Sequence, residues 1–199
     1  MGFKKKKCIS IDFGSKYIKL AVGEYKNDHL IIDKLISEEI GDDIWSDGRI
    51  LDSDRLKNIV YGMLKSNNIK INNVSFTISS SKIVKREIEV PKVDAADRLN
   101  LIKYEIEQYL PDDVENYVFQ YKVIDDVKVN EELYDRIFVA VIPRIIVDEY
   151  YQLAIDMKLN PALLDIHCNS IVKAINYNYN EFFKNDNGIV AVDIGNSNM

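Results

Sequence analysis

The sequence predicts an α/β protein into which a second, smaller α/β subdomain is inserted. Within residues 7–79, apolar residues recur with strand, helix and strand periods in the order βββαβ. Residues 82–159 follow a different order, βαββα, and a strand and a helix of the earlier kind return after them. The composition, 47% hydrophobic and 29% charged, is typical of a globular protein of one or two domains.

The first three strands are expected to form an antiparallel meander, because tight turns join them. Along the first strand, Ile9, Ile11 and Phe13 share one face, whereas Ser10 and Asp12 share the other. Glycine, serine, asparagine and aspartate occupy the joints between the strands. The predicted strands are 7–13, 17–24 and 29–40, with turns at 14–15 and 27–28.

A helix and a strand complete this first part of the chain. Ser53 or Asp54 is expected to cap the helix, and Asn67-Asn68 suits its end. Its apolar residues recur at spacings of three and four, which indicates one buried face. These residues are Leu56, Ile59, Val60, Met63 and Leu64, and the strand that follows is 74–79.

The insert should contain a sheet of its own. Asp94 caps its first helix and Pro111 stops it. Residues 136–142 are nearly all apolar, as expected of a central strand, and Pro143 suits the first turn of the next helix. The predicted elements are strands at 82–90, 117–123 and 136–142 with helices at 95–110 and 143–158, and after the insert a strand at 162–166, a helix at about 169–183 and a strand at 189–194.

Charge and cysteine content narrow the classes of function. The formal net charge of −6, without a basic stripe among aromatic residues, argues against nucleic-acid binding. Cys8 and Cys168 are too few for a disulfide framework, so we expect buried free thiols in a cytoplasmic protein. No apolar run reaches the roughly 20 residues that span a bilayer. The basic run at residues 4–7 is either a solvated tail or a weak attraction to an anionic membrane surface.

Two segments far apart in the chain share one pattern. Residues 11–15 are Ile-Asp-Phe-Gly-Ser and residues 192–197 are Val-Asp-Ile-Gly-Asn-Ser, each at the end of a predicted strand. Glycine lets the backbone approach a phosphate, and successive N–H groups of such a turn bind anions. The carboxylate before the turn suits Mg²⁺, which keeps much of its hydration shell. Either loop alone is also compatible with an ordinary strand turn, but the pair could clamp both sides of a nucleotide phosphate tail.

Lys19 lies on the second predicted strand, four residues beyond Ser15. From there its ammonium group could reach a phosphate. A solvated strand lysine is the alternative interpretation.

Residues 11–19 resemble the first phosphate motif of the actin-like ATPase superfamily, whose pattern is Asp-x-Gly-Ser followed by Lys, and residues 192–195 resemble the second. Within that superfamily, essentially the whole chain resembles the PilM family of type IV pilus assembly proteins. The segments that carry this resemblance are 47–50 (DGRI), 88–91 (IEVP), 105–111 (EIEQYLP), 139–143 (VAVIP) and 159–161 (LNP) followed by Leu164-Asp165.

The resemblance implies an actin-like (ribonuclease H-like) α/β fold. Residues 1–81 with 160–188 would form its IA subdomain, and residues 82–159 an inserted subdomain of the IC type that the family shares with FtsA. Residues 189–199 would be the first strand and phosphate loop of a second domain, the rest of which is expected beyond residue 199.

The resemblance also implies ATP and Mg²⁺ as ligands. Asp12 and Asp193 would hold Mg²⁺ through water. His167 stands about where relatives that hydrolyse ATP well often carry an acidic residue. At most a weak ATPase activity is therefore expected of the full-length protein and none of the fragment, and His167 is expected to start a helix. Lys16 departs from the small or polar residue common at its position. The residues that would bind the nucleotide are Asp12, Gly14, Ser15, Lys16, Lys19, Asp193, Gly195 and Asn196.

The implied function is that of an ATP-binding assembly protein of the type IV pilus, peripheral at the inner face of the cytoplasmic membrane. A PilN-type tail of an inner-membrane protein would bind in the groove between IA and IC, and other pilus assembly proteins would be further partners. Six tyrosines of the insert are either core or interface residues: Tyr104, Tyr109, Tyr117 and Tyr121, with Tyr150 and Tyr151 on its last helix. A membrane-tethered FtsA-like division protein and a nucleotide-free scaffold stay open as alternatives. A sugar kinase of the same superfamily is disfavoured, because such enzymes lack an insert of this type.

Overall fold

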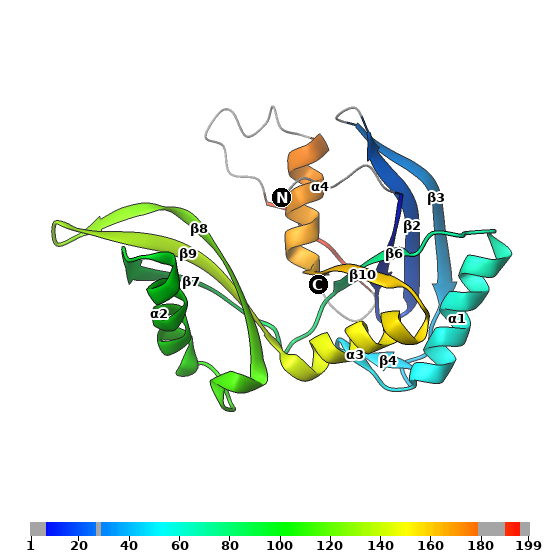
Figure 1. The fold of residues 1–199 in the computed structure, drawn as a ribbon, viewed down its shortest axis with the longest axis horizontal. Helices are drawn as coiled ribbons and strands as arrows, with labels where there is room; N and C mark the ends of the chain where they lie inside the picture. Colours follow the sequence, from blue (N-terminus) through cyan, green and yellow to red (C-terminus); the bar gives the residue numbers. More distant parts are fainter. Residues whose placement is uncertain (1–6, 27–28, 179–189, 196–199) are drawn as a thin grey trace. The chain divides into compact units, whose positions relative to one another are not determined.

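The structure is a computed structural model that describes residues 7–26, 29–178 and 190–195 (Figure 1). The chain divides into two compact units, Met1–Ser80 with Glu149–Met199, and Ser81–Asp148. The sequence places the end of the insert at residue 159, whereas the second unit ends at Asp148. The difference arises because Glu149 and the residue after it, Tyr150, make hydrogen bonds to residues 45–50 of the first unit.

The first unit contains a five-stranded sheet of order β10-β6-β1-β2-β3. The predicted antiparallel meander of β1, β2 and β3 is confirmed, and β6 and β10 lie parallel to β1. The alternation predicted for β1 is also confirmed, because Ile9, Ile11 and Phe13 are buried. The strands are β1 (Cys8–Phe13), β2 (Tyr17–Lys26), β3 (His29–Glu39), β6 (Asn73–Ile78) and β10 (Asn160–Ile166).

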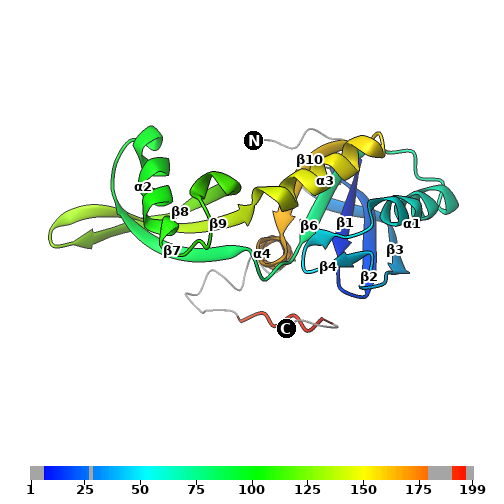
Figure 2. The same cartoon turned by 90° about the horizontal axis from the view of Figure 1, so that it is seen from below.

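Helices lie on both faces of this sheet (Figures 1 and 2). On the face that buries Phe13 lie α1 (Ser53–Ser66) and the part of α3 (Arg144–Asp156) that belongs to this unit; α4 (His167–Asn178) lies on the other. The cap predicted for α1 was wrong by one residue: Asp52 caps it, since its side chain accepts from the N–H of Arg55. Asn67 ends the helix as predicted.

A short hairpin that the sequence did not predict precedes α1. It consists of β4 (Trp45–Ser46) and β5 (Arg49–Ile50). Its turn residues Asp47 and Gly48 have φ angles of 46° and 82°. A Cβ on Gly48 would lie 2.7 Å from the Cβ of Ser80, so glycine is required both for the backbone angle and for the close approach.

The second unit contains a three-stranded antiparallel sheet of order β7-β9-β8. The central position predicted for residues 136–142 is confirmed, since they lie in β9. Pro143 ends β9 instead of starting a helix, and Asp94 precedes α2 without a side-chain cap bond. The elements are β7 (Val84–Pro91), α2 (Ala95–Glu107), a 3₁₀ turn (Val114–Asn116), β8 (Tyr117–Val129) and β9 (Glu132–Pro143).

Two predictions near the end of the chain were wrong. Residues 190–195 form no strand, because within the described ranges no strand pairs with them. Cys168 is exposed, because α4 buries no residue completely in the described structure, and Cys8 of β1 is half-buried. Within the described ranges, no helix is long and apolar enough to cross a membrane.

Candidate functional site

Strand pairing sets Asp12 at the centre of a polar row across the sheet. Lys19 of β2 lies opposite Asp12, Thr77 of β6 lies on its other side, and Asp165 of β10 pairs with Thr77. The row crosses the carboxyl ends of the parallel strands β1, β6 and β10, the edge at which open α/β sheets bind their ligands.

The turn after β1 is tight, and it leaves N–H groups available. Gly14 donates its N–H to the carbonyl of Tyr17 at 3.1 Å, and a Cβ on Gly14 would lie 3.1 Å from that same oxygen. The carbonyl of Lys16 accepts from Ile40 at 2.9 Å. The N–H groups of Ser15 and Lys16 find no acceptor in the part of the chain that the structure describes. Such free, neighbouring N–H groups can bind a phosphate oxygen.

The charged side chains of this first loop partly neutralise one another. Lys19 Nζ lies 3.5 Å from Asp12 Oδ2, and the lysine side chain is 65% exposed while the aspartate is 27% exposed. Lys16 Nζ lies 3.9 Å from Glu39 and over the ring of Tyr17. Both lysines therefore form only weak, solvent-exposed ion pairs, and their side chains can turn towards an anion.

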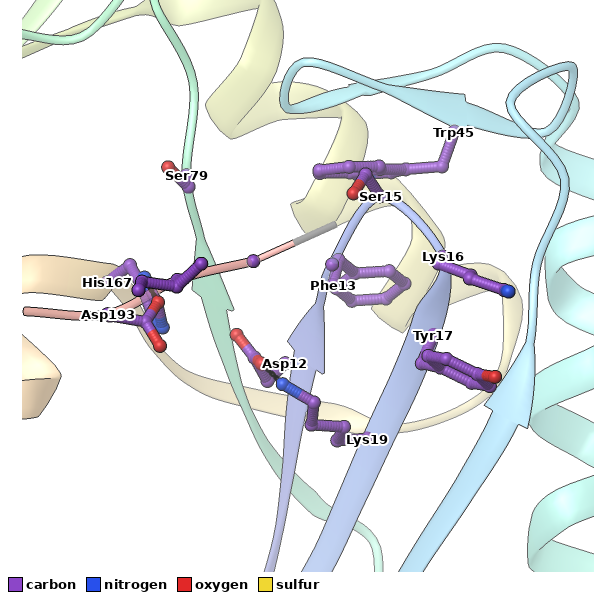
Figure 3. Close-up of a pocket in the computed structure, with 13 residues that line it drawn as sticks. Asp12, Phe13, Ser15, Lys16, Tyr17, Lys19, Trp45, Ser79, His167 and Asp193 are labelled. Carbon is purple, nitrogen blue, oxygen red and sulfur yellow. Dashed lines mark hydrogen bonds and ion pairs between the residues drawn. The ribbon is translucent and has the colours of Figure 1, made fainter. Parts of the chain in front are cut away.

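The second loop faces the same pocket. Asp193 Oδ2 lies 3.6 Å from Nδ1 of His167, which is the first residue of α4, as predicted. Figure 3 shows these two side chains together, and Asp12 beside Lys19. Asn196, the remaining predicted contact of this loop, lies outside the described residues.

The two loops line one pocket of about 150 Å³. All the predicted site residues that the structure describes contribute to it. Sequence reasoning missed Phe13, Tyr17, Trp45, Ser79 and Ile194; of these, Trp45 had a signal, because it is the single tryptophan and stands two residues before the Asp47-Gly48 turn. The predicted residues in the lining are Asp12, Gly14, Ser15, Lys16, Lys19, Asp193 and Gly195, together with His167.

Trp45 is fixed from behind by α3. Its Nε1 donates to the hydroxyl of Tyr150 at 2.6 Å, and Tyr150 is fully buried. Burial raises the pKa of Tyr150 far above its ordinary value, while the bond from Trp45 opposes the rise, so the phenol stays neutral. The neighbouring Glu149 accepts from Arg49 at 2.8 Å and from the N–H of Ile50 at 3.0 Å.

Asp165 lies next to the pocket but does not line it. Its carboxylate accepts from Asn169 and Lys173 of α4, each at 2.7 Å, and from the N–H of Ile166 at 2.9 Å. Burial acts to raise the pKa of Asp165, but these hydrogen bonds and the charge of Lys173 outweigh it and the pKa is lowered. Asp165 thus holds side chains of α4.

The pocket contains two carboxylates that could hold a hydrated metal ion. Within the described residues, no group of three or more His, Cys, Asp or Glu side chains could hold a metal ion. Asp12 and Asp193 do line the same pocket, and both carboxylates are in contact with solvent. Two such carboxylates suit Mg²⁺ bound through its own waters.

The chain matches several solved structures. A chain of a structure described as the PilM-PilN type IV pilus biogenesis complex matches with a TM-score of 0.72 and 19% identity over 82% of this chain and 48% of that one. The cytoplasmic domain of EpsL, an inner-membrane component of the Vibrio cholerae type II secretion system, matches at 0.47, with 14% identity over 80% and 57%. A Bacteroides thetaiotaomicron protein of actin-like ATPase fold and unknown function matches at 0.45, with 11% identity over 87% and 57%.

The first of these likenesses confirms the predicted fold class, an actin-like α/β domain with an inserted subdomain. The chain spans about half the length of the matched PilM chain. No curated protein matches the sequence significantly. The family model of the type IV pilus assembly protein PilM matches residues 10–199, nearly the whole chain, and the chain therefore belongs to the PilM family.

Proposed function

We propose that this chain forms one side of a Mg²⁺–ATP site, in a protein that assembles type IV pili by coupling its nucleotide state to an inner-membrane partner. Family membership supports the pilus role. The observation that supports the nucleotide role is that both Asp-x-Gly loops line one pocket, although they lie at opposite ends of the chain.

In this proposal each loop has a defined role. The N–H groups of Ser15 and Lys16 bind phosphate oxygens, and Lys19 turns from Asp12 to the phosphate charge. Asp12 and Asp193 hold the waters of Mg²⁺, and Gly195 and Asn196 bind the phosphates from the other loop. Bound ATP then acts as a conformational ligand that favours one arrangement of the protein through its differential affinity.

Calorimetric titration of Mg²⁺–ATP into the full-length protein tests the nucleotide role. Asp12→Ala should weaken binding at least tenfold, because it removes a charge that orders the metal's water shell. Asp97→Ala is the matched control, because Asp97 is an exposed aspartate of the second unit and should leave affinity unchanged. If the unsubstituted protein does not bind Mg²⁺–ATP, it is a nucleotide-free scaffold.

The proposed partner is a PilN-type cytoplasmic tail, and the protein is then held peripherally at the inner face of the membrane. PilM is in complex with PilN in the matched structure, which supports this proposal. The proposal that the tail binds in the groove between IA and IC rests on the family resemblance alone. A tail peptide should bind the full-length protein with an affinity that Mg²⁺–ATP changes. Binding to lipid vesicles without any tail would instead favour the FtsA-like alternative.

A further inference from the structure

The proposed phosphate contacts give no role to Trp45, which lines the pocket, or to Tyr150, which accepts its hydrogen bond. We propose that Tyr150 and Glu149 of α3 are positioning residues for the nucleotide phosphates. They hold two lining residues of the pocket, Trp45 and Phe13, in place before the ligand arrives. This inference rests on the proposed nucleotide binding.

Tyr150 fixes the position of the Trp45 ring. Trp45 lines the pocket, yet only 3% of it is exposed, so its indole N–H needs a buried partner. That partner is the Tyr150 hydroxyl at 2.6 Å. Without it the indole N–H would be buried and unpaired, which is costly enough to favour another ring position.

The same tyrosine ring packs against the residue that starts the first loop. Phe13 directly precedes Gly14, and its ring centroid lies 5.3 Å from that of Tyr150 in an edge-on arrangement. Phe76 of β6 closes the cluster, 5.6 Å from Tyr150 and 5.9 Å from Phe13. Trp45, Ser15 and Phe13 all line the pocket (Figure 3). One buried side chain, Tyr150, therefore contacts two of its lining residues, Trp45 and Phe13.

Glu149 secures the other strand of the Trp45 hairpin. Its carboxylate accepts from the N–H of Ile50 and forms an ion pair of 2.6 Å with Arg49. The hairpin is thus attached to consecutive residues of α3, through Trp45 on β4 and through Arg49 and Ile50 on β5. A hairpin held in this way loses less conformational freedom when the nucleotide binds, and this smaller entropic cost raises the affinity.

Titration of Mg²⁺–ATP into the full-length protein tests this role, with Tyr150→Phe as the variant. This change keeps the ring and removes only the acceptor of Trp45. We expect affinity to fall about fivefold, the factor that loss of one neutral hydrogen bond corresponds to. The matched control is Tyr151→Phe, because Tyr151 is the next residue of α3 and is 58% exposed. It should leave affinity unchanged.

A spectroscopic signature separates positioning from a merely structural role. Trp45 is labelled as 5-fluorotryptophan, and its ¹⁹F resonance is assigned by its loss in Trp45→Phe. Without nucleotide, the resonance should shift in Tyr150→Phe and not in Tyr151→Phe, and Mg²⁺–ATP should shift it in the unsubstituted protein. The thermal unfolding midpoint, measured on the same samples, should show both variants folded at the titration temperature.

The outcomes decide between the two proposals. Equal Mg²⁺–ATP affinity of Tyr150→Phe and unsubstituted protein overturns the positioning role and leaves nucleotide binding intact. No binding by the unsubstituted protein overturns the proposed function, and the positioning role with it. If Tyr150→Phe does not fold, Glu149→Gln takes its place: it should bind at least twofold more weakly, and unchanged affinity overturns the inference.

Discussion

The two Asp-x-Gly loops have nearly the same sequence pattern and very different surroundings. The first loop joins two paired strands, and Ile11 and Phe13 are buried beneath it. In the second, Val192 and Ile194 are 68% and 74% exposed, and among the strands that the structure describes none pairs with them. The same motif therefore follows a paired, buried strand in the first loop and exposed, unpaired chain in the described part of the second.

The largest effect should come from the apolar residue directly before each aspartate. Ile11→Ala in the 199-residue chain should lower the free energy of unfolding by about 2–5 kcal/mol, because it leaves a cavity at a fully buried site. Val192→Ala should change it by less than about 0.5 kcal/mol, because Val192 is exposed. Urea unfolding measures both. Equal losses would contradict the contrast between the loops.

A smaller loss is expected at the turn of the first loop. Gly14→Ala would place a Cβ 3.1 Å from the carbonyl of Tyr17, tighter than ordinary contact, so we expect a loss on the order of 1 kcal/mol. Gly62→Ala is the matched control. Gly62 lies in α1 with open space above it, so alanine should stabilise the chain by roughly 0.5–1 kcal/mol. Unchanged stability of Gly14→Ala would contradict the tight contact at this turn.

The anchoring of α4 by Asp165 should depend on pH. The folded chain lowers the pKa of Asp165, so its stabilisation is complete above the ordinary aspartate value of about 4 and is lost as the pH falls through the lower folded value. Below about pH 4, the unsubstituted chain should therefore lose stability more steeply than Asp165→Asn. Urea unfolding across the range checks this, and parallel curves would contradict it.

The smallest effect is expected at the contact between α4 and the second loop. His167 and Asp193 lie 3.6 Å apart and are both partly exposed, so His167→Ala should change the free energy of unfolding by less than about 0.5 kcal/mol. A much larger loss, measured in the same urea titration, would mean that this contact shapes the second loop after all.

The periodicity of apolar residues was enough to predict most of the larger elements, including the strands on either side of the first loop. Strands β1 and β2, helix α1 and, in the second unit, the central β9 have a clear apolar pattern, because each buries one face or both. The β4–β5 hairpin was missed because strands of two residues have no period to detect. The predicted strand at 189–194 failed for the opposite reason: an apolar run was present, but a strand also needs a partner, which a local pattern cannot supply.

The β8–β9 hairpin is longer than predicted for a related reason. Its outer part contains the ion pair between Arg136 and Asp125 and the pair between Lys92 and Asp126, so it follows no apolar alternation. Backbone pairing continues to a turn at Asn130 and Glu131, whose φ angles of 50° and 70° suit a tight hairpin.

The exposed thiol of Cys168 offers a chemical handle on the pocket. Cys168 follows His167 directly, while burial raises the pKa of Cys8, the other cysteine, and so lowers its thiolate fraction. A maleimide dye used in limiting amount near neutral pH should therefore label position 168 first. Its emission would then follow the pocket without any engineered residue.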